Sequence, residues 1–189
     1  SANKFGRVSP TTAQHVAAEF GDALLVLDGG ACEVGIESTI VDCTRGVPVL
    51  LRPGAITRDD IARACGQRPL SKEELPNHTP RASGTLLAHY APNAKVRLMD
   101  AQQLQAALQS LAADRPTVAI YHRSALPISA QRVHLRAMPV DAQATARELF
   151  GTLRDFDELG AKQIWIETPP NTADWEGVRD RLQRAAAAG

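Results

Sequence analysis

The sequence predicts an α/β protein of two parts joined by a linker, and three observations lead to this prediction. Short apolar runs separated by glycine-rich turns fill residues 1–65, which indicates hairpins or a meander. Residues 66–94 contain several prolines and no periodicity, as a linker or a lid does. From residue 95 to 189 strand patterns alternate with helical patterns, which favours a small Rossmann-like parallel sheet covered by helices on both faces.

The first part has helix signals at both ends and strand signals between them. Hydroxyl caps precede two predicted helices, one over 13–20 and one that begins after Thr57 and runs to about Cys65. Branched apolar runs predict strands over 24–27, 38–42 and 49–51.

The second part repeats a strand followed by a helix. Strands are predicted over 96–99, 117–121, 133–135 and 164–166, and apolar stripes predict helices around 104–111 and 149–156. A last helix begins near Thr172 and presents Trp175, Val178 and Leu182 as its apolar face, so we expect Trp175 in the core. His122 and Glu167 follow strands, where parallel sheets place ligands, but this fold-level analogy alone does not predict a site.

Composition narrows the classes of protein to consider. Lys plus Arg and Asp plus Glu are equal at 21 each, so the basic excess of a nucleic-acid-binding protein is missing. The three cysteines, Cys32, Cys43 and Cys65, lack a metal-binding spacing, so we expect buried or half-buried thiols and no protein-bound metal. No apolar run approaches the roughly 18 residues of a membrane span, and we expect a cytoplasmic protein without a membrane partner.

A short polar cluster is the strongest candidate for chemistry. Glu37, Ser38 and Thr39 stand at the mouth of one predicted strand, and Arg52 stands at the end of the next. Small hydroxyls beside a guanidinium suit a charged small molecule, because the guanidinium fork bonds two oxygens at once. The alternative is a plain hairpin in which Ser and Thr cap their own backbone and Arg52 is a surface charge.

The order of the motifs resembles the threonylcarbamoyl-AMP synthase family, the YrdC-like enzymes, in the long form with a C-terminal domain. The resemblance rests on Ser1-Ala2-Asn3, Ser9-Pro10-Thr11, residues 35–42, Leu51-Arg52-Pro53-Gly54 and His89-Tyr90-Ala91-Pro92. It implies that residues 1–65 are a partial YrdC-like half-domain, 66–94 a linker or lid, and 95–189 the C-terminal domain. In that family a long segment with a Lys-x-Arg motif precedes Ser-Ala-Asn, so we expect a piece of a larger enzyme that is inactive alone.

The resemblance also implies a reaction and its residues. L-Threonine, bicarbonate and ATP with its bound Mg²⁺ would give threonylcarbamoyl-adenylate and pyrophosphate, and tRNA-modifying partner proteins would use the adenylate. Arg52 would be catalytic, Ser38 would bind L-threonine, and the expected ATP-binding residues are Ser1, Asn3, Ser9, Arg52 and Tyr90. Glu37 is expected to orient a backbone or an arginine rather than to act as a general base.

Alternatives remain open at several of these positions. Residues 1–9 also suit an ordinary loop with a helix cap, and His89 and Tyr90 also suit an anchor that holds the linker to the domain surface. Two other functions compete with the synthase: a module that binds double-stranded RNA, and a regulatory or interaction domain in which the C-terminal unit steadies the lid.

Overall fold

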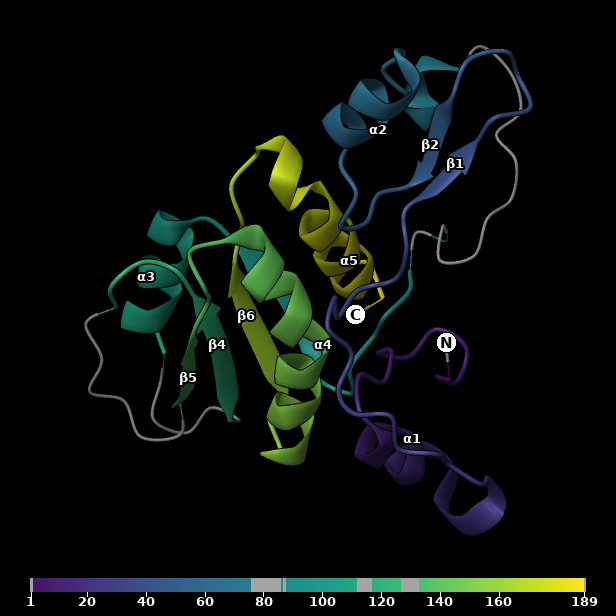
Figure 1. Cartoon of the computed structure of the whole chain (residues 1–189). Coiled ribbons are helices and arrows are strands. Elements are labelled where there is room, and N and C mark those ends of the chain that lie inside the picture. The colour runs from purple at the N-terminus through teal and green to yellow at the C-terminus, as the bar shows by residue number, and fades with distance from the viewer. Residues whose placement is uncertain (1, 76–85, 87, 112–116, 127–132, 189) are drawn as a thin grey trace.

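The structure consists of a parallel sheet with helices on both faces and a smaller N-terminal part packed against one of these helices. The computed structural model describes residues 2–75, 86, 88–111, 117–126 and 133–188. Figure 1 shows the sheet at one end, the hairpin with its helix at the other, and a helix between them.

The sheet has four strands, β3 (Lys95–Met99), β4 (Val118–His122), β5 (Val133–Ala137) and β6 (Gln163–Glu167). Their order is β3-β6-β4-β5, and every neighbouring pair is parallel. The central strands are apolar on both faces because both faces are covered. The predicted parallel sheet is therefore confirmed, and each predicted strand of this part lies within one residue or two of its observed bounds.

Helices cover the two faces of this sheet and make three layers. α3 (Ala101–Gln109) packs its buried Leu104 against Val118, Ile120 and Trp165 on one face. α4 (Ala142–Glu158) and α5 (Glu176–Ala186) cover the other face with a larger core that includes Leu149, Phe150 and Leu182. The carboxylates of Asp100 and Asp141 cap α3 and α4 by accepting backbone N–H bonds in the first turn.

The N-terminal part contains few helices and strands. It contains α1 (Ala13–Phe20), the hairpin of β1 (Ile40–Asp42) and β2 (Val49–Arg52), and α2 (Arg58–Cys65). The two strands are antiparallel, as the hairpin prediction requires. α2 begins at the predicted cap, where Thr57 and Asp60 bond each other's backbone N–H in a capping box.

Two expectations for this part are wrong. Residues 24–27 form no strand, because no neighbouring strand among the described residues accepts their backbone hydrogen bonds, and Leu25 and Leu27 are each 87% exposed. All three cysteines are exposed rather than buried, because Cys32 and Cys43 lie in irregular segments and Cys65 is the last residue of α2.

α5 joins the two parts. Gly177, in its first turn, lies so close to the segment after β2 that an added Cβ would stand 2.8 Å from the Gly54 carbonyl oxygen. Just before α5, Trp175 is 3% exposed and completes the core, as predicted. Val8, Ile36 and Tyr90 of the preceding part belong to the same core cluster as α4 and α5.

None of the helices in the described ranges combines the length and the hydrophobicity that a bilayer span requires.

Candidate functional site

Ser38 and Arg52 meet where the two strands of the hairpin open. The register pairs Ile40 with Arg52, which brings the residues just before β1 beside the end of β2. Arg52 donates from Nε to the Ser38 carbonyl oxygen (3.0 Å) and from Nη2 to the Ser38 hydroxyl (3.2 Å). Arg52 is only 7% exposed whereas Ser38 faces solvent, so the arginine is not a surface charge but the support beneath an accessible hydroxyl.

Glu37 binds two partners that come from distant parts of the chain. Its Oε1 accepts a hydrogen bond from the Ser9 hydroxyl, and its Oε2 accepts one of 2.9 Å from Nε of Arg181 on α5. The expectation that Glu37 orients an arginine is therefore confirmed. Because both carboxylate oxygens are engaged, Glu37 is held in place rather than poised to take up a proton.

Arg181 is the site residue that the sequence prediction missed. It is 1% exposed, and its guanidinium also donates to the carbonyl oxygens of Glu37 (2.9 Å) and Pro53. Its position could have revealed it, because Arg181 falls on the apolar face of α5 next to Leu182 and three residues after Val178. A charged residue on a buried helical face needs a charged or carbonyl partner.

Tyr90 and His89 place unpaired polar atoms close to these arginines. The Tyr90 hydroxyl and Nδ1 of His89 are buried and have no hydrogen-bond partner among the described residues. Tyr90 has a φ of 60°, which is uncommon for a residue with a side chain, and its ring lies 5.5 Å from the guanidinium carbon of Arg181. Backbone strain and orphaned polar groups of this kind concentrate at ligand sites.

α5 also fastens the end of the linker that carries Tyr90. The backbone N–H of His89 donates to the Arg184 carbonyl (3.2 Å), and the Arg184 side chain donates to the Leu86 carbonyl. Asp180 bonds both Arg181 (3.0 Å) and Arg184 (2.7 Å). His89 and Tyr90 thus anchor the linker, as the alternative interpretation expected, and they also lie at the site. Of the predicted linker or lid over 66–94, residues 76–85 and 87 lie outside the described residues.

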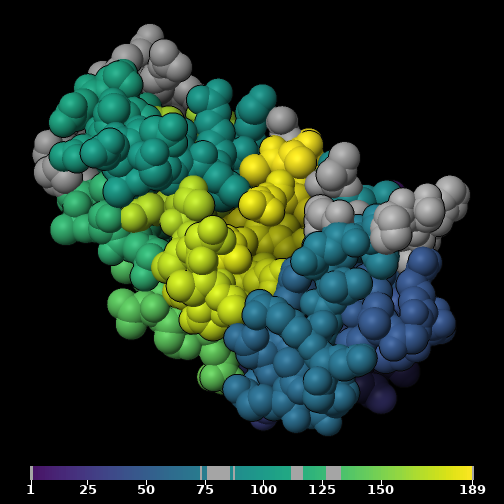
Figure 2. All heavy atoms as spheres, turned by 90° about the horizontal axis from the view of Figure 1, so that it is seen from above, coloured from purple at the N-terminus to yellow at the C-terminus, as the bar shows by residue number. Residues whose placement is uncertain are grey.

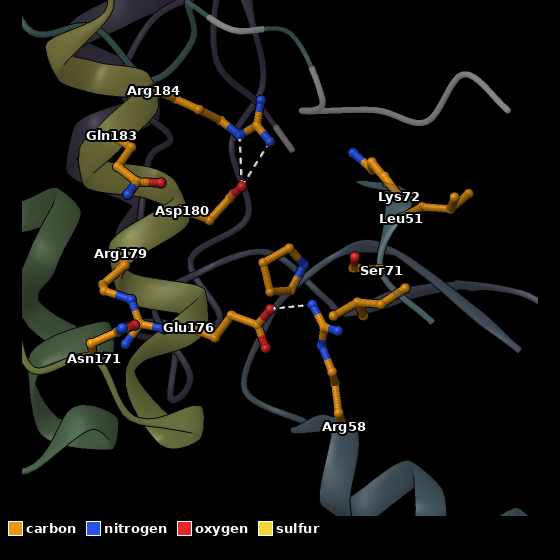
Figure 3. A pocket seen from close by; sticks show the side chains of 12 residues that line it. Leu51, Arg58, Ser71, Lys72, Asn171, Glu176, Arg179, Asp180, Gln183 and Arg184 are labelled. Atoms are coloured by element: carbon orange, nitrogen blue, oxygen red, sulfur yellow. Dashed lines mark hydrogen bonds and ion pairs between the residues drawn. The ribbon is translucent and has the colours of Figure 1, made fainter. Parts of the chain in front are cut away.

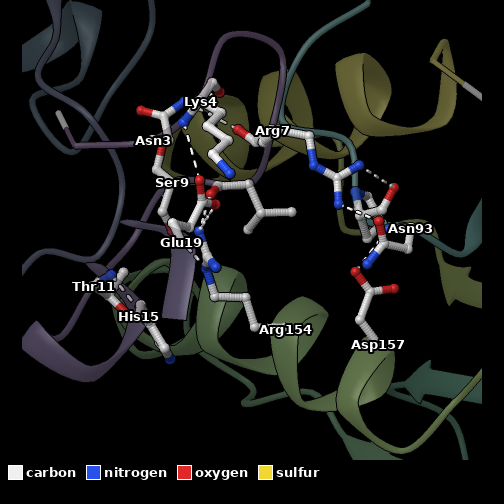
Figure 4. A network of polar contacts seen from close by, with 12 residues as sticks. Asn3, Lys4, Arg7, Ser9, Thr11, His15, Glu19, Asn93, Arg154 and Asp157 are labelled. Carbon is white, nitrogen blue, oxygen red and sulfur yellow. Dashed lines mark hydrogen bonds and ion pairs between the residues drawn. The ribbon is translucent and has the colours of Figure 1, made fainter. Parts of the chain in front are cut away.

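The N-terminal segment contacts the site through Ser9, whose hydroxyl donates to Glu37. Figure 4 shows the polar contacts of this segment with Arg154 of α4. Arg154 of α4 donates to the carbonyl oxygens of Val8 and Ser9 and forms an ion pair of 2.8 Å with Glu19, which holds Ser9 beside Glu37. Asn3 donates from its amide to the Arg7 carbonyl (3.1 Å) and so closes its own turn. Ser1, the remaining predicted ATP-binding residue, lies outside the described residues.

The electrostatics of the site follow from burial and from these partners. Burial alone would raise the pKa of the Glu37 carboxyl, but the Arg181 charge and the hydrogen bonds from Ser9 and Arg181 together lower it. Burial lowers the pKa of His89, and burial with the Glu37 charge raises the pKa of Tyr90. Near neutral pH the site therefore holds an ionised Glu37, a neutral imidazole and a protonated phenol.

A cleft of about 330 Å³ runs beside the site, between α5 and the hairpin with α2 (Figure 3). Arg58, Lys72, Arg179 and Arg184 give it a basic lining. Its two carboxylates form ion pairs of 2.7 Å, Glu176 with Arg58 and Asp180 with Arg184. Seen from above, α5 in yellow separates the sheet from the blue hairpin and α2 (Figure 2).

The arrangement suits the binding of a small polar ligand more than acid–base chemistry. It offers the exposed Ser38 hydroxyl and the fixed guanidinium of Arg52, beside a buried Tyr90 hydroxyl and His89 Nδ1 that have no hydrogen-bond partner in the described part of the chain. Within the described ranges no three His, Cys, Asp or Glu side chains gather in a way that could hold a metal ion. Glu167 at the end of β6 accepts hydrogen bonds from the backbone N–H and the hydroxyl of Ser124, and so holds the segment that follows the neighbouring strand β4.

Comparisons with known proteins match both parts of the chain. Residues 56–187 match the family model "Threonylcarbamoyl-AMP synthase, C-terminal domain", and residues 1–54 match a model described as "Telomere recombination". The threonylcarbamoyl-AMP synthase of Bacillus subtilis is 32% identical over 98% of this chain and 56% of its own length. The one of Pyrococcus abyssi is 30% identical over 98% and 56%, so the chain spans about half the length of these relatives.

Two solved structures are similar over the whole chain. P. abyssi Sua5 complexed with L-threonine superposes with a TM-score of 0.82 at 28% identity and covers 100% of this chain and 57% of its own. A P. abyssi Sua5 variant with a consecutive histidine and tyrosine replaced by alanine gives a TM-score of 0.84 at 27% identity, over 100% and 56%.

Proposed function

The chain belongs to the threonylcarbamoyl-AMP synthase family, and from this membership we propose that the full-length protein makes threonylcarbamoyl-AMP and pyrophosphate from L-threonine, bicarbonate and ATP. The threonine amine takes up carbon dioxide released from bicarbonate to form a carbamate. A carbamate oxygen then attacks the α-phosphorus of ATP, and pyrophosphate leaves. Mg²⁺ enters as part of the nucleotide substrate, and cytoplasmic tRNA-modifying partner proteins consume the adenylate.

The contact between Ser38 and Arg52 is the observation that carries this proposal. It places an accessible hydroxyl 3.2 Å from a buried guanidinium nitrogen, which fits an amino acid and a phosphate bound side by side. L-Threonine is present in the similar P. abyssi structure, which supports assigning Ser38 to threonine. Arg52 would neutralise phosphate charge as the carbamate attacks, which is how such reactions are mainly accelerated.

The unpaired groups of the linker support a nucleotide above this contact. The Tyr90 hydroxyl has no partner among the described residues, and a bound ligand would give it one. His89 and Tyr90 are consecutive, as are the histidine and tyrosine that are replaced in the similar P. abyssi Sua5 variant. We therefore assign Tyr90 to ATP, together with Ser9 and Arg52.

The test measures pyrophosphate release by the full-length protein and the binding of ATP and L-threonine by calorimetry. Arg52→Ala should weaken ATP binding about ten- to a hundredfold, because a hydrogen bond to a charged group contributes roughly 1.5 to 3 kcal/mol. Arg52→Lys keeps the charge but loses the fork, and it should also lose affinity. Threonine affinity should fall less, through the loosened Ser38.

Arg63→Ala is the matched control, because Arg63 is an exposed arginine of α2 whose side chain is 75% exposed. Unchanged ATP binding in Arg52→Ala would remove Arg52 from the site. If pyrophosphate release does not depend on threonine and bicarbonate, and the protein binds duplex RNA tightly, the nucleic-acid-binding alternative would be favoured over the synthase. Release of pyrophosphate by residues 1–189 alone would contradict the expectation that this stretch is inactive.

A further inference from the structure

Arg181 lies on α5, in the range that matches the C-terminal domain, yet three of its four hydrogen bonds within the described structure are with the chain segments that carry Ser38 and Arg52. We propose that Arg181 is a positioning residue, which sets the distance between the threonine-binding hydroxyl and the phosphate-binding guanidinium. The proposal rests on the proposed function, since it assigns a role in that same site. It makes α5 part of the site rather than a domain that merely docks against it.

The guanidinium bridges two backbone segments, each one residue away from a site residue. Nη2 donates to the carbonyl oxygen of Glu37 (2.9 Å), the residue before Ser38. Nη1 donates to the carbonyl oxygen of Pro53, the residue after Arg52. Because one rigid planar group bonds both segments, Arg181 adds a constraint on the spacing of Ser38 and Arg52 to that of the hairpin pairing and of their direct hydrogen bonds.

The remaining bonds fix the guanidinium itself. Nε donates to Oε2 of Glu37 (2.9 Å), and Nη1 also bonds Oδ2 of Asp180 (3.0 Å), one residue earlier on α5. The side chain has no solvent exposure, and the Tyr90 ring lies against it. A lysine could keep the charge but could not bond four acceptors in two directions, so the chemistry requires arginine here.

If Arg181 only held the two parts together, breaking any other ion pair between them would reduce activity to a similar extent. Arg58 of α2 and Glu176 of α5 form such a pair at 2.7 Å, and neither contacts Ser38 or Arg52 in the described structure. Arg58→Gln is therefore the matched control: it breaks another bond between α5 and the N-terminal part, and it leaves every described contact of Ser38, Arg52 and Arg181 in place.

The experiment compares full-length wild type, Arg181→Lys, Arg181→Gln, Asp180→Asn and Arg58→Gln by melting temperature, by kcat, and by KM for threonine and for ATP. Arg181→Lys should remain folded and lose on the order of 100-fold in kcat/KM, because small misplacements of reacting groups cost about that much. Asp180→Asn, which keeps Arg181 but removes one of its supports, should lose less. Arg58→Gln should keep the wild-type kcat and KM values.

Wild-type kcat/KM in Arg181→Lys, or an equal loss in Arg58→Gln, would overturn the positioning role. Amide hydrogen exchange at residues 38–40 and 52–55 tests it independently of activity: exchange should be faster in Arg181→Lys than in wild type and Arg58→Gln. If exchange in Arg181→Lys equals that of wild type, the proposal is refuted whatever the activity of the variant. Absence of threonine-dependent activity in wild type would refute the proposed function alone and leave the exchange result decisive for Arg181.

Discussion

The Glu37 carboxylate is largely buried, with 15% of its side chain exposed. The cost of burying its charge must therefore be offset by its partners. Burying a carboxylate is costly unless charges and hydrogen bonds compensate. Arg181 supplies the opposite charge and Ser9 a hydroxyl, and His89 and Tyr90 are the other titratable groups that face it. The lowered pKa of Glu37 is the result of this compensation.

The first prediction concerns acid stability. Since the folded pKa of Glu37 lies below its ordinary value of 4.5, the ion pair stabilises fully above pH 4.5 and is lost as the pH falls through the folded value. Glu37→Gln should lower the free energy of unfolding at pH 7 by about 3 to 5 kcal/mol, because Arg181 stays buried without its counter-charge. Urea unfolding at several pH values checks both statements.

The difference between variant and wild type should shrink as the pH falls below 4.5. Glu19 and Glu167 also have lowered pKa values and contribute acid sensitivity that both proteins share. A difference that stays constant from pH 7 to pH 3 would mean that Glu37 is not the residue whose protonation matters.

The second prediction separates binding from stability at Tyr90. Its hydroxyl has no partner among the described residues, so Tyr90→Phe should leave the free energy of unfolding unchanged or raise it by about 1 kcal/mol. ATP affinity of the full-length protein should nevertheless fall, by roughly 0.5 to 1.5 kcal/mol, if the hydroxyl bonds the nucleotide. A variant that is less stable but binds ATP normally would show that the hydroxyl has a structural partner.

At the scale of elements, α5 is placed by a close approach of two backbones. Gly177 stands against Gly54, and an added Cβ would also lie 2.9 Å from Cδ1 of Ile36. Contacts this short leave no room for a side chain, and backbone atoms cannot move aside cheaply. The approach brings the next turn of α5, with Arg181, onto the carbonyl groups of Glu37 and Pro53.

The third prediction is that Gly177→Ala displaces α5 and destabilises the protein by about 1 to 3 kcal/mol. Gly151→Ala in α4 is the control, because nothing lies within 4 Å of an added Cβ there. Alanine in a helix interior is favoured over glycine by roughly 0.5 to 1 kcal/mol, so the control should be slightly stabilised. Thermal or urea unfolding of both variants would reveal the opposite signs, and equal effects would refute the close approach.

At the scale of the molecule, the two parts share one hydrophobic core. Val8, Ile36 and Tyr90 pack into the same cluster as Leu149 and Phe150 of the sheet domain. The ion pair between Arg154 and Glu19 and the one between Arg181 and Glu37 reinforce this contact. Elements that share a core tend to unfold together.

The fourth prediction is therefore a single cooperative transition for residues 1–189, with calorimetric and van't Hoff enthalpies that agree. Residues 95–189 alone contain the whole sheet and its three helices, so they should also fold cooperatively, with a lower melting temperature than in the longer chain. Two separate transitions in the longer chain would contradict the shared core.

The sheet domain could be predicted from sequence because each of its elements buries a regular apolar pattern. The stripe of Leu149, Phe150, Leu153 and Phe156 repeats with helical spacing, and all four are buried in α4. The start of α2 could be predicted from Thr57 for a similarly local reason, since the Thr57 hydroxyl accepts a hydrogen bond from the backbone N–H of Asp60 in the first turn. Local chemistry therefore accounts for most of the fold.

The misses arise from information that is not local. A branched run such as residues 24–27 becomes a strand only where another strand accepts its hydrogen bonds. The Ser38 and Arg52 pair could be proposed because both stand in one hairpin. The partner of Arg181, in contrast, lies 144 residues away, so the sequence could indicate that this arginine needs an acceptor but not that Glu37 provides it.

The buried contact of Arg181 with Glu37 has a consequence for recombination between relatives. A chimera that joins the first part of this chain to the C-terminal domain of a relative would keep Glu37 but take the residue that faces it from the other parent. A mismatch at either position would leave one charge enclosed without its opposite. A segment exchanged between relatives should therefore include α5 together with the residues that Arg181 contacts, Glu37 and Pro53.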